Sequence, residues 1–153
     1  MLAGVSLESL HETVSLFEHL PKETRIEGLI SLAGEAGGLA PRKGESFDVE
    51  DVRQDIECLD VVGLYARLET DERVRLAATV GKDVTTLTRA MVTLLVKNLD
   101  GETLDGIDSV RREVIERVVG EALMRQRSNT GFVVLRRLHE LTAALRHPST
   151  RTA

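Results

Sequence analysis

Apolar residues recur at helical spacing in the first forty residues of the chain. Ser6 is a suitable N-cap for a first helix, and Pro21 is well placed at the start of a second. The glycine pair Gly37-Gly38 ends that second helix, and Pro41 opposes its resumption. The positions predicted to face the core are Leu7, Leu10, Val14 and Phe17, followed by Ile26, Leu29, Ile30 and Ala33.

The middle of the chain changes to a period of two, which is typical of strands. Apolar residues alternate with others in the stretches 58–69 and 72–80, and a short polar link joins the two. We therefore expect an antiparallel hairpin with one face on the core. A third, short edge strand is expected near 46–52, where Phe47 and Val49 alternate with charged residues.

Helical spacing returns in the second half. Asp83 is a good N-cap for a third helix, which the turn Asp100-Gly101 closes. Thr103 opens a short helical turn, and Ile107 is expected in the core. One further helix is expected over Val110, Val114, Val118 and Leu123, and a last one over Phe132, Leu135, Leu138, Leu141 and Leu145, after a polar break at 125–131 and before Pro148.

Strands clustered between two groups of helices predict an α+β fold. We expect two layers, with a small antiparallel sheet of two to three strands flanked by helices. Residues 1–148 are predicted to form a single domain, and residues 149–153 a disordered tail. A chain of 153 residues is long enough to bury a substantial core.

The composition narrows the classes of function. The net charge of −5 argues against binding broadly to nucleic acids or membrane surfaces, because both require a basic face. No apolar run approaches the roughly 20 residues needed to cross a bilayer. The N-terminus also lacks the features of a signal peptide. A single cysteine cannot form an internal disulfide, so we expect a cytoplasmic protein.

Known motifs for metals, phosphates and hydrolysis do not occur. His11 and His19 are too widely spaced to form a helical zinc pair, and neither a P-loop nor a GxSxG elbow is present. We therefore predict that the chain binds no metal or cofactor of its own. Cys58 remains as the candidate nucleophile, at the junction of a polar loop and the first strong strand. A small buried hydrophobe is the ordinary alternative for a lone cysteine.

The order of segments around Cys58 resembles the SufE family, the sulfur acceptors of iron–sulfur cluster assembly. The stretch SLFEHLPKETRIEGLISLAGEAGGLAP is similar to the family's two N-terminal helices and the loop after them. The family then has a cysteine that passes directly into a strand, in the manner of Gly-Cys-x-Ser-x-Val-Trp; Cys58 matches the cysteine and Val62 the valine. KDVTTLTRAMVTLLVKNLDGETLDGI resembles the family's central helix, and Arg127-Ser128-Asn129 the start of its last helix.

This resemblance implies a function and partners. A cysteine desulfurase of the SufS type, which carries pyridoxal phosphate, would transfer persulfide sulfur to Cys58, and an iron–sulfur scaffold complex would receive it. The chain would then be a sulfur carrier and desulfurase activator more than an enzyme itself. Arg127 would stabilise charge near the site or dock the partner, with a solvated surface arginine as the alternative. Asp83 lies near a family position that is often acidic, beside its plain role as a cap.

Three residues depart from the family pattern. Glu57, Asp60 and Gly63 replace a glycine, a serine and a large aromatic residue. Carboxylates beside a thiol disfavour its thiolate, which nearby arginines such as Arg53 or Arg127 would offset. These departures leave two alternatives open. One is a non-catalytic SufE-like adaptor that binds a desulfurase or scaffold without accepting sulfur. The other is a redox-sensing thiol, against which the acidic neighbours argue.

Overall fold

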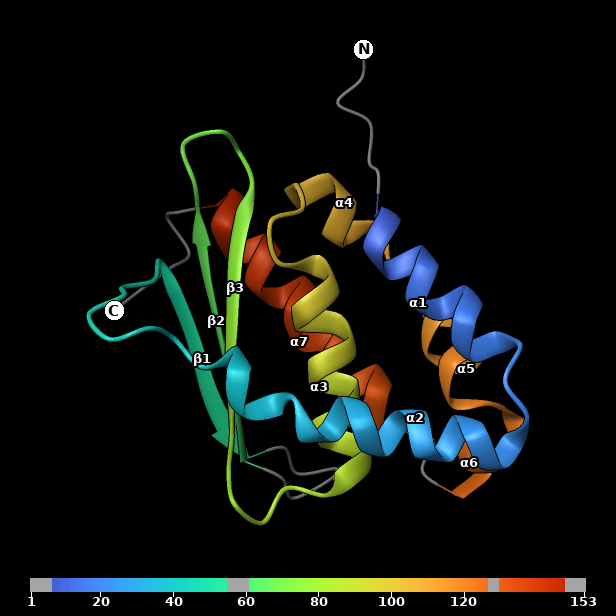
Figure 1. Ribbon diagram of the computed structural model, residues 1–153. Coiled ribbons are helices and arrows are strands. Elements are labelled where there is room, and N and C mark those ends of the chain that lie inside the picture. The colour runs from blue at the N-terminus through green and yellow to red at the C-terminus, as the bar shows by residue number, and fades with distance from the viewer. Residues whose placement is uncertain (1–6, 55–60, 127–129, 148–153) are drawn as a thin grey trace.

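The fold is described by a computed structural model over residues 7–54, 61–126 and 130–147. Helices come first, three strands follow, and helices complete the chain, as Figure 1 shows. In chain order, the elements are α1 (Glu8–Glu18), α2 (Lys22–Gly34), the 3-10 turn η1 (Ala36–Leu39), β1 (Val49–Gln54), β2 (Val61–Leu68), β3 (Val74–Val80), α3 (Thr86–Leu99), α4 (Leu104–Asp108), α5 (Glu113–Val119), α6 (Glu121–Gln126) and α7 (Thr130–Arg146). This order confirms the predicted α+β class.

The three strands form one antiparallel sheet in the order β1-β2-β3. The predicted alternation is confirmed, because Val62, Leu64 and Ala66 of β2 are buried together with Val74, Leu76 and Ala78 of β3. The edge strand β1 lies slightly later in the chain than the predicted 46–52. Its last residue, Gln54, pairs with Val61, the first residue of β2.

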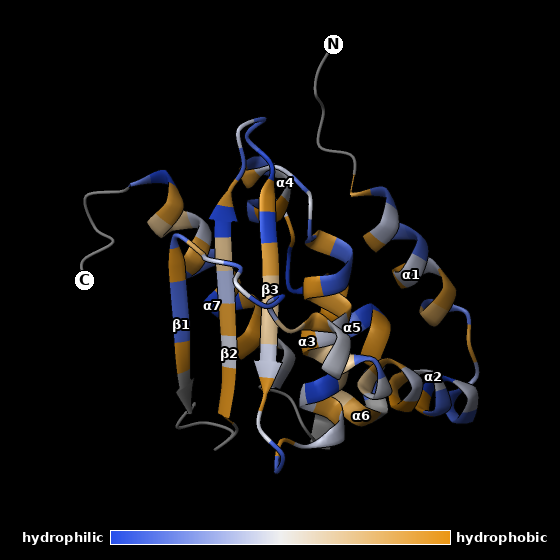
Figure 2. Cartoon of the chain, turned by 60° about the vertical axis from the view of Figure 1, so that its left-hand side comes forward, coloured by the Kyte–Doolittle hydropathy of each residue, from blue (hydrophilic) through white to orange (hydrophobic). Residues whose placement is uncertain are grey.

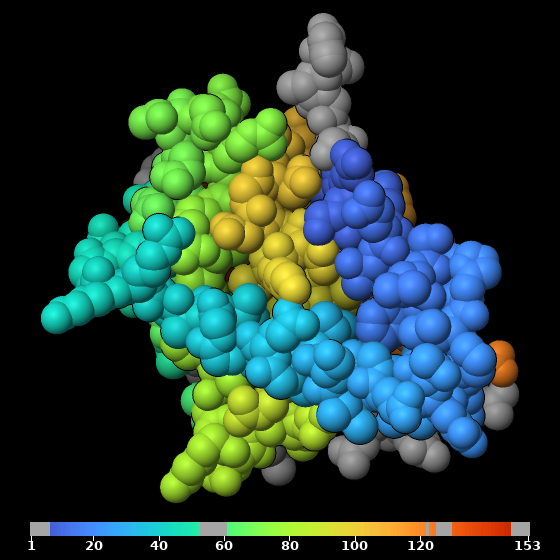
Figure 3. Space-filling view, in the orientation of Figure 1, coloured from blue at the N-terminus to red at the C-terminus, as the bar shows by residue number. Residues whose placement is uncertain are grey.

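Helices cover the inner face of the sheet (Figures 1 and 2). The helix α7 packs against β2 and β1, and α3 packs against β3 and α7. On the far side of α3 lies α2, which the space-filling view in Figure 3 shows as a continuous band across this face of the molecule. The described helices and the sheet share one apolar cluster, whose members include Leu10, Leu64 and Leu94. None of the helices in the described ranges has both the length and the apolar character needed to cross a membrane.

The spacing of apolar residues predicted the buried side chains correctly for α1 but not for α2. Leu7, Leu10, Val14 and Phe17 are all buried, as predicted, while Ser6 lies outside the described residues. In α2, however, the buried stripe is Leu29, Leu32 and Ala33.

The prediction was wrong for Ile26 and Ile30 of α2, which are 38% and 56% exposed. Apolar residues occupy two adjacent stripes of this helix, so spacing alone does not choose between them. The close approach of Gly28 selects one stripe, because a Cβ there would lie 2.9 Å from the Phe17 ring.

The third helix begins later than predicted. Asp83 is an exposed turn residue, and the N-cap is Thr85, whose hydroxyl accepts a hydrogen bond from the Thr88 N–H at 3.4 Å. Buried Val84 lies between the two positions and donates its N–H to Gly81 O, which closes the turn before the helix can start. The assignment of Asp83 as the cap is therefore wrong.

This correction gives a matched pair of variants. Thr85→Ala should lower the free energy of unfolding by about 1 kcal/mol, because the Thr88 N–H loses its side-chain acceptor. Asp83→Ala should change it by no more than about 0.5 kcal/mol, as expected for an exposed residue that caps nothing. Urea unfolding followed by circular dichroism measures both values. A larger loss for Asp83→Ala than for Thr85→Ala would contradict the assignment.

The C-terminal half also departs from the prediction at one point. Thr103 caps α4 by accepting from the Gly106 N–H, and Ile107 is fully buried, as predicted. The single helix predicted over Val110–Leu123 is instead split into α5 and α6. Gly120 separates them with a φ of 87°, a left-handed conformation that favours glycine. Of the residues predicted to line the last helix, Leu135, Leu138, Leu141 and Leu145 are buried, and Phe132 is partly buried.

Candidate functional site at one end of the sheet

The predicted site residues fall in different parts of the structure. Cys58 and Arg127 lie outside the described residues, as do Glu57 and Asp60. Asp83 is described, in the exposed turn after β3. The described residues that flank these positions in the chain define the surroundings of the site.

The chain on both sides of residues 55–60 lies at one end of the sheet. Gln54 and Val61 are paired there, and the next pair inward on β2 and β3 is Val62 with Val80. The Gly81 N–H donates to the carbonyl of Val61 at 2.9 Å. The turn that carries Asp83 therefore begins beside the residue where the Cys58 segment enters β2.

The start of α7 is directed to this same end. Arg137, in the first half of α7, binds the carbonyl of Val62, whereas Arg146, its last residue, bonds to Asp105 and Asp108 of α4. The helix α4 follows Gly101, whose N–H binds Val74 O at the opposite end of the sheet. Figure 1 shows the same direction for α7. The described flanks of all three predicted site residues thus converge on one end of the sheet.

Arg137 fixes the strands at this end. Its side chain is completely buried, and its Nε donates to the Asp51 carboxylate at 3.0 Å. Its Nη2 also donates to the backbone carbonyls of Asp51 at 2.9 Å and Val62 at 2.7 Å. One guanidinium therefore ties β1 to β2 just before the Cys58 segment. The sequence held a signal for it, since Arg137 falls on the apolar stripe of α7 between Val134 and Leu141.

Arg89 fixes the turn that carries Asp83. Its Nη2 donates to Gly81 O at 2.8 Å, and its Nε donates to Val84 O at 3.1 Å. No carboxylate among the described residues pairs with it, so it adds positive charge at this end of the sheet. Sequence reasoning did not find Arg89, because a donor to backbone carbonyls leaves no motif.

Gly63 has a local reason to be small. The hydroxyls of Tyr65 and Thr79 share a hydrogen bond of 3.2 Å on the outer face of the sheet. A Cβ at Gly63 would lie 2.5 Å from the Thr79 hydroxyl oxygen, 2.9 Å from the Tyr65 hydroxyl oxygen and 3.1 Å from a methyl of Val52. These side chains occupy the space in which a large aromatic residue at position 63 would have to lie.

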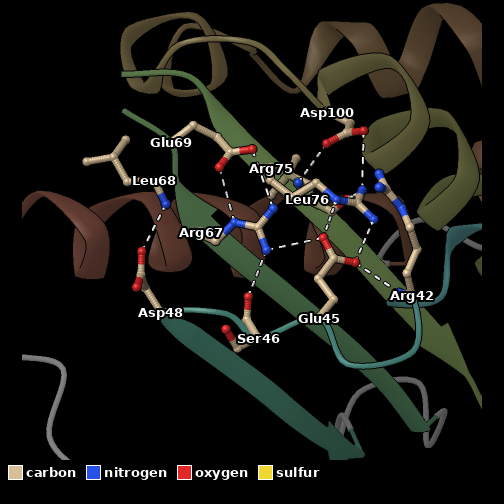
Figure 4. A network of polar contacts seen from close by, with 10 residues as sticks. All are labelled: Arg42, Glu45, Ser46, Asp48, Arg67, Leu68, Glu69, Arg75, Leu76 and Asp100. Carbon is tan, nitrogen blue, oxygen red and sulfur yellow. Dashed lines mark hydrogen bonds and ion pairs between the residues drawn. The ribbon is translucent and has the colours of Figure 1, made fainter. Parts of the chain in front are cut away.

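A charged network fastens the loop before β1 to the outer face of the sheet (Figure 4). Arg75 forms two hydrogen bonds to the Glu45 carboxylate, at 2.8 and 3.1 Å, and Arg67 approaches the same carboxylate at 3.2 Å. The bonds from Arg75 and from the Arg42 N–H lower the pKa of Glu45 to about 2. Both guanidiniums also lie over the Phe47 ring, with Arg67 at 5.4 Å and Arg75 at 6.0 Å. These ion pairs and ring contacts hold the loop before β1 against the outer face of the sheet.

Comparisons with known proteins show the fold. No family model matches the chain, and a search of curated proteins also gave no match. A solved structure similar to this one is the solution structure of a hypothetical protein from Thermus thermophilus. It aligns with a TM-score of 0.65 over 88% of this chain and 93% of that one, at 24% sequence identity. At this identity, the likeness establishes a shared fold.

Proposed function

We propose that this chain is a SufE-like sulfur acceptor that takes persulfide sulfur from a cysteine desulfurase onto Cys58. The main support is the convergence at one end of the sheet. The paired residues Gln54 and Val61, the Asp83 turn and the start of α7 are the flanks of the three residues that the resemblance selects. A lone thiol in a reducing cytoplasm suits this role.

The transfer is a thiol–persulfide exchange. The Cys58 thiolate attacks the outer sulfur of the persulfide on the desulfurase cysteine. A new sulfur–sulfur bond forms at Cys58, the original one breaks, and the desulfurase cysteine leaves as a thiolate. Cys58 then carries the sulfur to an iron–sulfur scaffold complex. No external oxidant or reductant is needed for the exchange.

The described residues contribute rigidity and charge to this proposal. Arg137 holds the ends of β1 and β2, and therefore fixes the two points between which residues 55–60 run. Arg89 supplies a cation without a described carboxylate partner. Positive charge favours a thiolate, and it would oppose the effect of Glu57 and Asp60.

The second candidate is an adaptor that binds a desulfurase or scaffold and accepts no sulfur. The replacements at 57, 60 and 63 motivate it. Packing around Gly63 adds to the case, because the hydrogen-bonded pair of Tyr65 and Thr79 takes the place of the family's aromatic side chain. The two candidates share a partner and differ only in whether Cys58 reacts.

Mass spectrometry after incubation with a cysteine desulfurase and free cysteine separates the two candidates. We expect the native chain to gain the mass of one sulfur atom on the peptide that contains Cys58. Cys58→Ser, and the native chain incubated without free cysteine, should gain none. A native chain that binds the desulfurase but stays unmodified would establish the adaptor and rule out the acceptor.

A further inference from the structure

A pocket lies beside the first half of α7. It is formed between the α4–α5 connection and the first half of α7, and it has a volume of about 670 Å³. Pockets for small ligands commonly have volumes of this order. Its apolar wall contains Val110, Val133 and Leu135. Nothing in the proposed sulfur transfer uses this pocket.

Two arginines without a carboxylate partner in the described residues line the pocket. Arg112 places its guanidinium over the Phe132 ring, with Cζ 4.1 Å from the ring centroid. Arg111, beside it, is exposed. A stacked guanidinium is held in one orientation while its N–H donors stay available, which lowers the entropy lost when it binds an anion.

The acidic residues of the pocket do not cancel this charge. Asp108 accepts from Arg146 at 2.8 Å and from the Thr142 hydroxyl at 2.5 Å, so its carboxylate is already engaged. Glu113, which is exposed in the first turn of α5, is the other carboxylate in the lining, and three arginines line the same pocket. The pocket therefore combines a cationic side with an apolar wall.

We propose that this pocket binds a small organic anion. The carboxylate or phosphate group of this ligand accepts hydrogen bonds from Arg111 and Arg112, because a guanidinium donates two parallel hydrogen bonds to either group. Its apolar body packs against Val110, Val133 and Leu135. The proposal is independent of Cys58, so the failure of either proposal leaves the other standing.

Amide chemical shifts of the isotope-labelled full chain test the proposal with three probes. Benzoate and phenyl phosphate carry an anion on an aromatic body, and benzyl alcohol carries the same body without charge. We expect the two anions to shift the amides of Val110, Arg112 and Val133, and the stronger of them identifies the preferred anionic group. Benzyl alcohol should bind about tenfold more weakly, because it lacks the charge-assisted hydrogen bonds.

Charge-matched variants locate the binding site. Arg112→Gln should weaken binding of the preferred anion about tenfold, whereas Lys82→Gln, which removes one charge in the exposed turn after β3, should leave it unchanged. Arg111→Gln serves as the second pocket variant if Arg112→Gln does not fold. Equal losses for the pocket variant and Lys82→Gln would overturn the proposal. So would equal binding of benzyl alcohol, shifts confined to other regions, or no shifts at all.

Discussion

Replacing Arg137 with methionine should lower the free energy of unfolding by about 3 to 5 kcal/mol, the usual cost of removing one partner of a buried ion pair. The side chain of Arg137 is completely buried, and that of Asp51 is only 22% exposed. Methionine leaves the Asp51 carboxylate without its bond from Nε. It also leaves the carbonyls of Asp51 and Val62 without the Nη2 donor. Urea unfolding of the two chains measures the difference.

The neighbouring arginine provides a matched control. Arg136 is exposed on the same helix, so Arg136→Met should cost no more than about 1 kcal/mol. The double variant Arg137→Met with Asp51→Asn should be more stable than Arg137→Met alone, because it no longer leaves a carboxylate uncompensated. A loss for Arg137→Met no greater than that for Arg136→Met would contradict the role assigned to the buried pair.

Cys58→Ser should abolish the stimulation of a cysteine desulfurase by this chain, in an assay that follows sulfide release with a thiol reductant present. The thiolate is the nucleophile in sulfur exchange, and a serine hydroxyl of nearly the same size does not ionise at neutral pH. We expect a loss of more than about tenfold, down to the rate of the desulfurase alone.

Two measurements make this result interpretable. The urea unfolding curve of Cys58→Ser should match that of the native chain, which shows that the fold is intact. Binding of the variant to the desulfurase should also persist, because the substitution of serine for cysteine replaces only the sulfur atom of the side chain by oxygen. Stimulation by Cys58→Ser equal to that by the native chain would refute the sulfur-acceptor proposal.

The spacing of apolar residues predicted the sheet and several helices, because in those elements the spacing alone determines which side chains are buried. In β2 and β3, the alternation of apolar residues allows only one face of the strands to be buried. That face carries Leu64 and Leu76, and it is the buried face in the structure. The pattern of α2 has two solutions, and tertiary contacts, among them the approach of Gly28 to Phe17, decide between them. The choice of Thr85 as the N-cap of α3 accompanies the burial of Val84, which a scan for capping residues does not reveal.

The sequence could predict which segments contribute to the candidate site, but not the arginines that hold those segments in place. Sequence and resemblance could name Cys58, Asp83 and Arg127 separately. The convergence of the described residues that flank them depends on the strand register and on the direction of α7, which are properties of the tertiary structure. Arg89 and Arg137 were missed for a related reason, because both bind backbone carbonyls that lie next to them only after folding.

The outer edge of β1 has a consequence for self-association. An edge strand can pair with a strand of another molecule and so begin aggregation, and inward-pointing charge is one of the devices that prevent this. Asp51 lies on the inner face of β1, opposite Leu64 and bound to Arg137. A fourth strand added beside β1 would have to cover this ion pair instead of an apolar surface. The bond that secures β1 within the sheet therefore also discourages growth of the sheet from one molecule into the next.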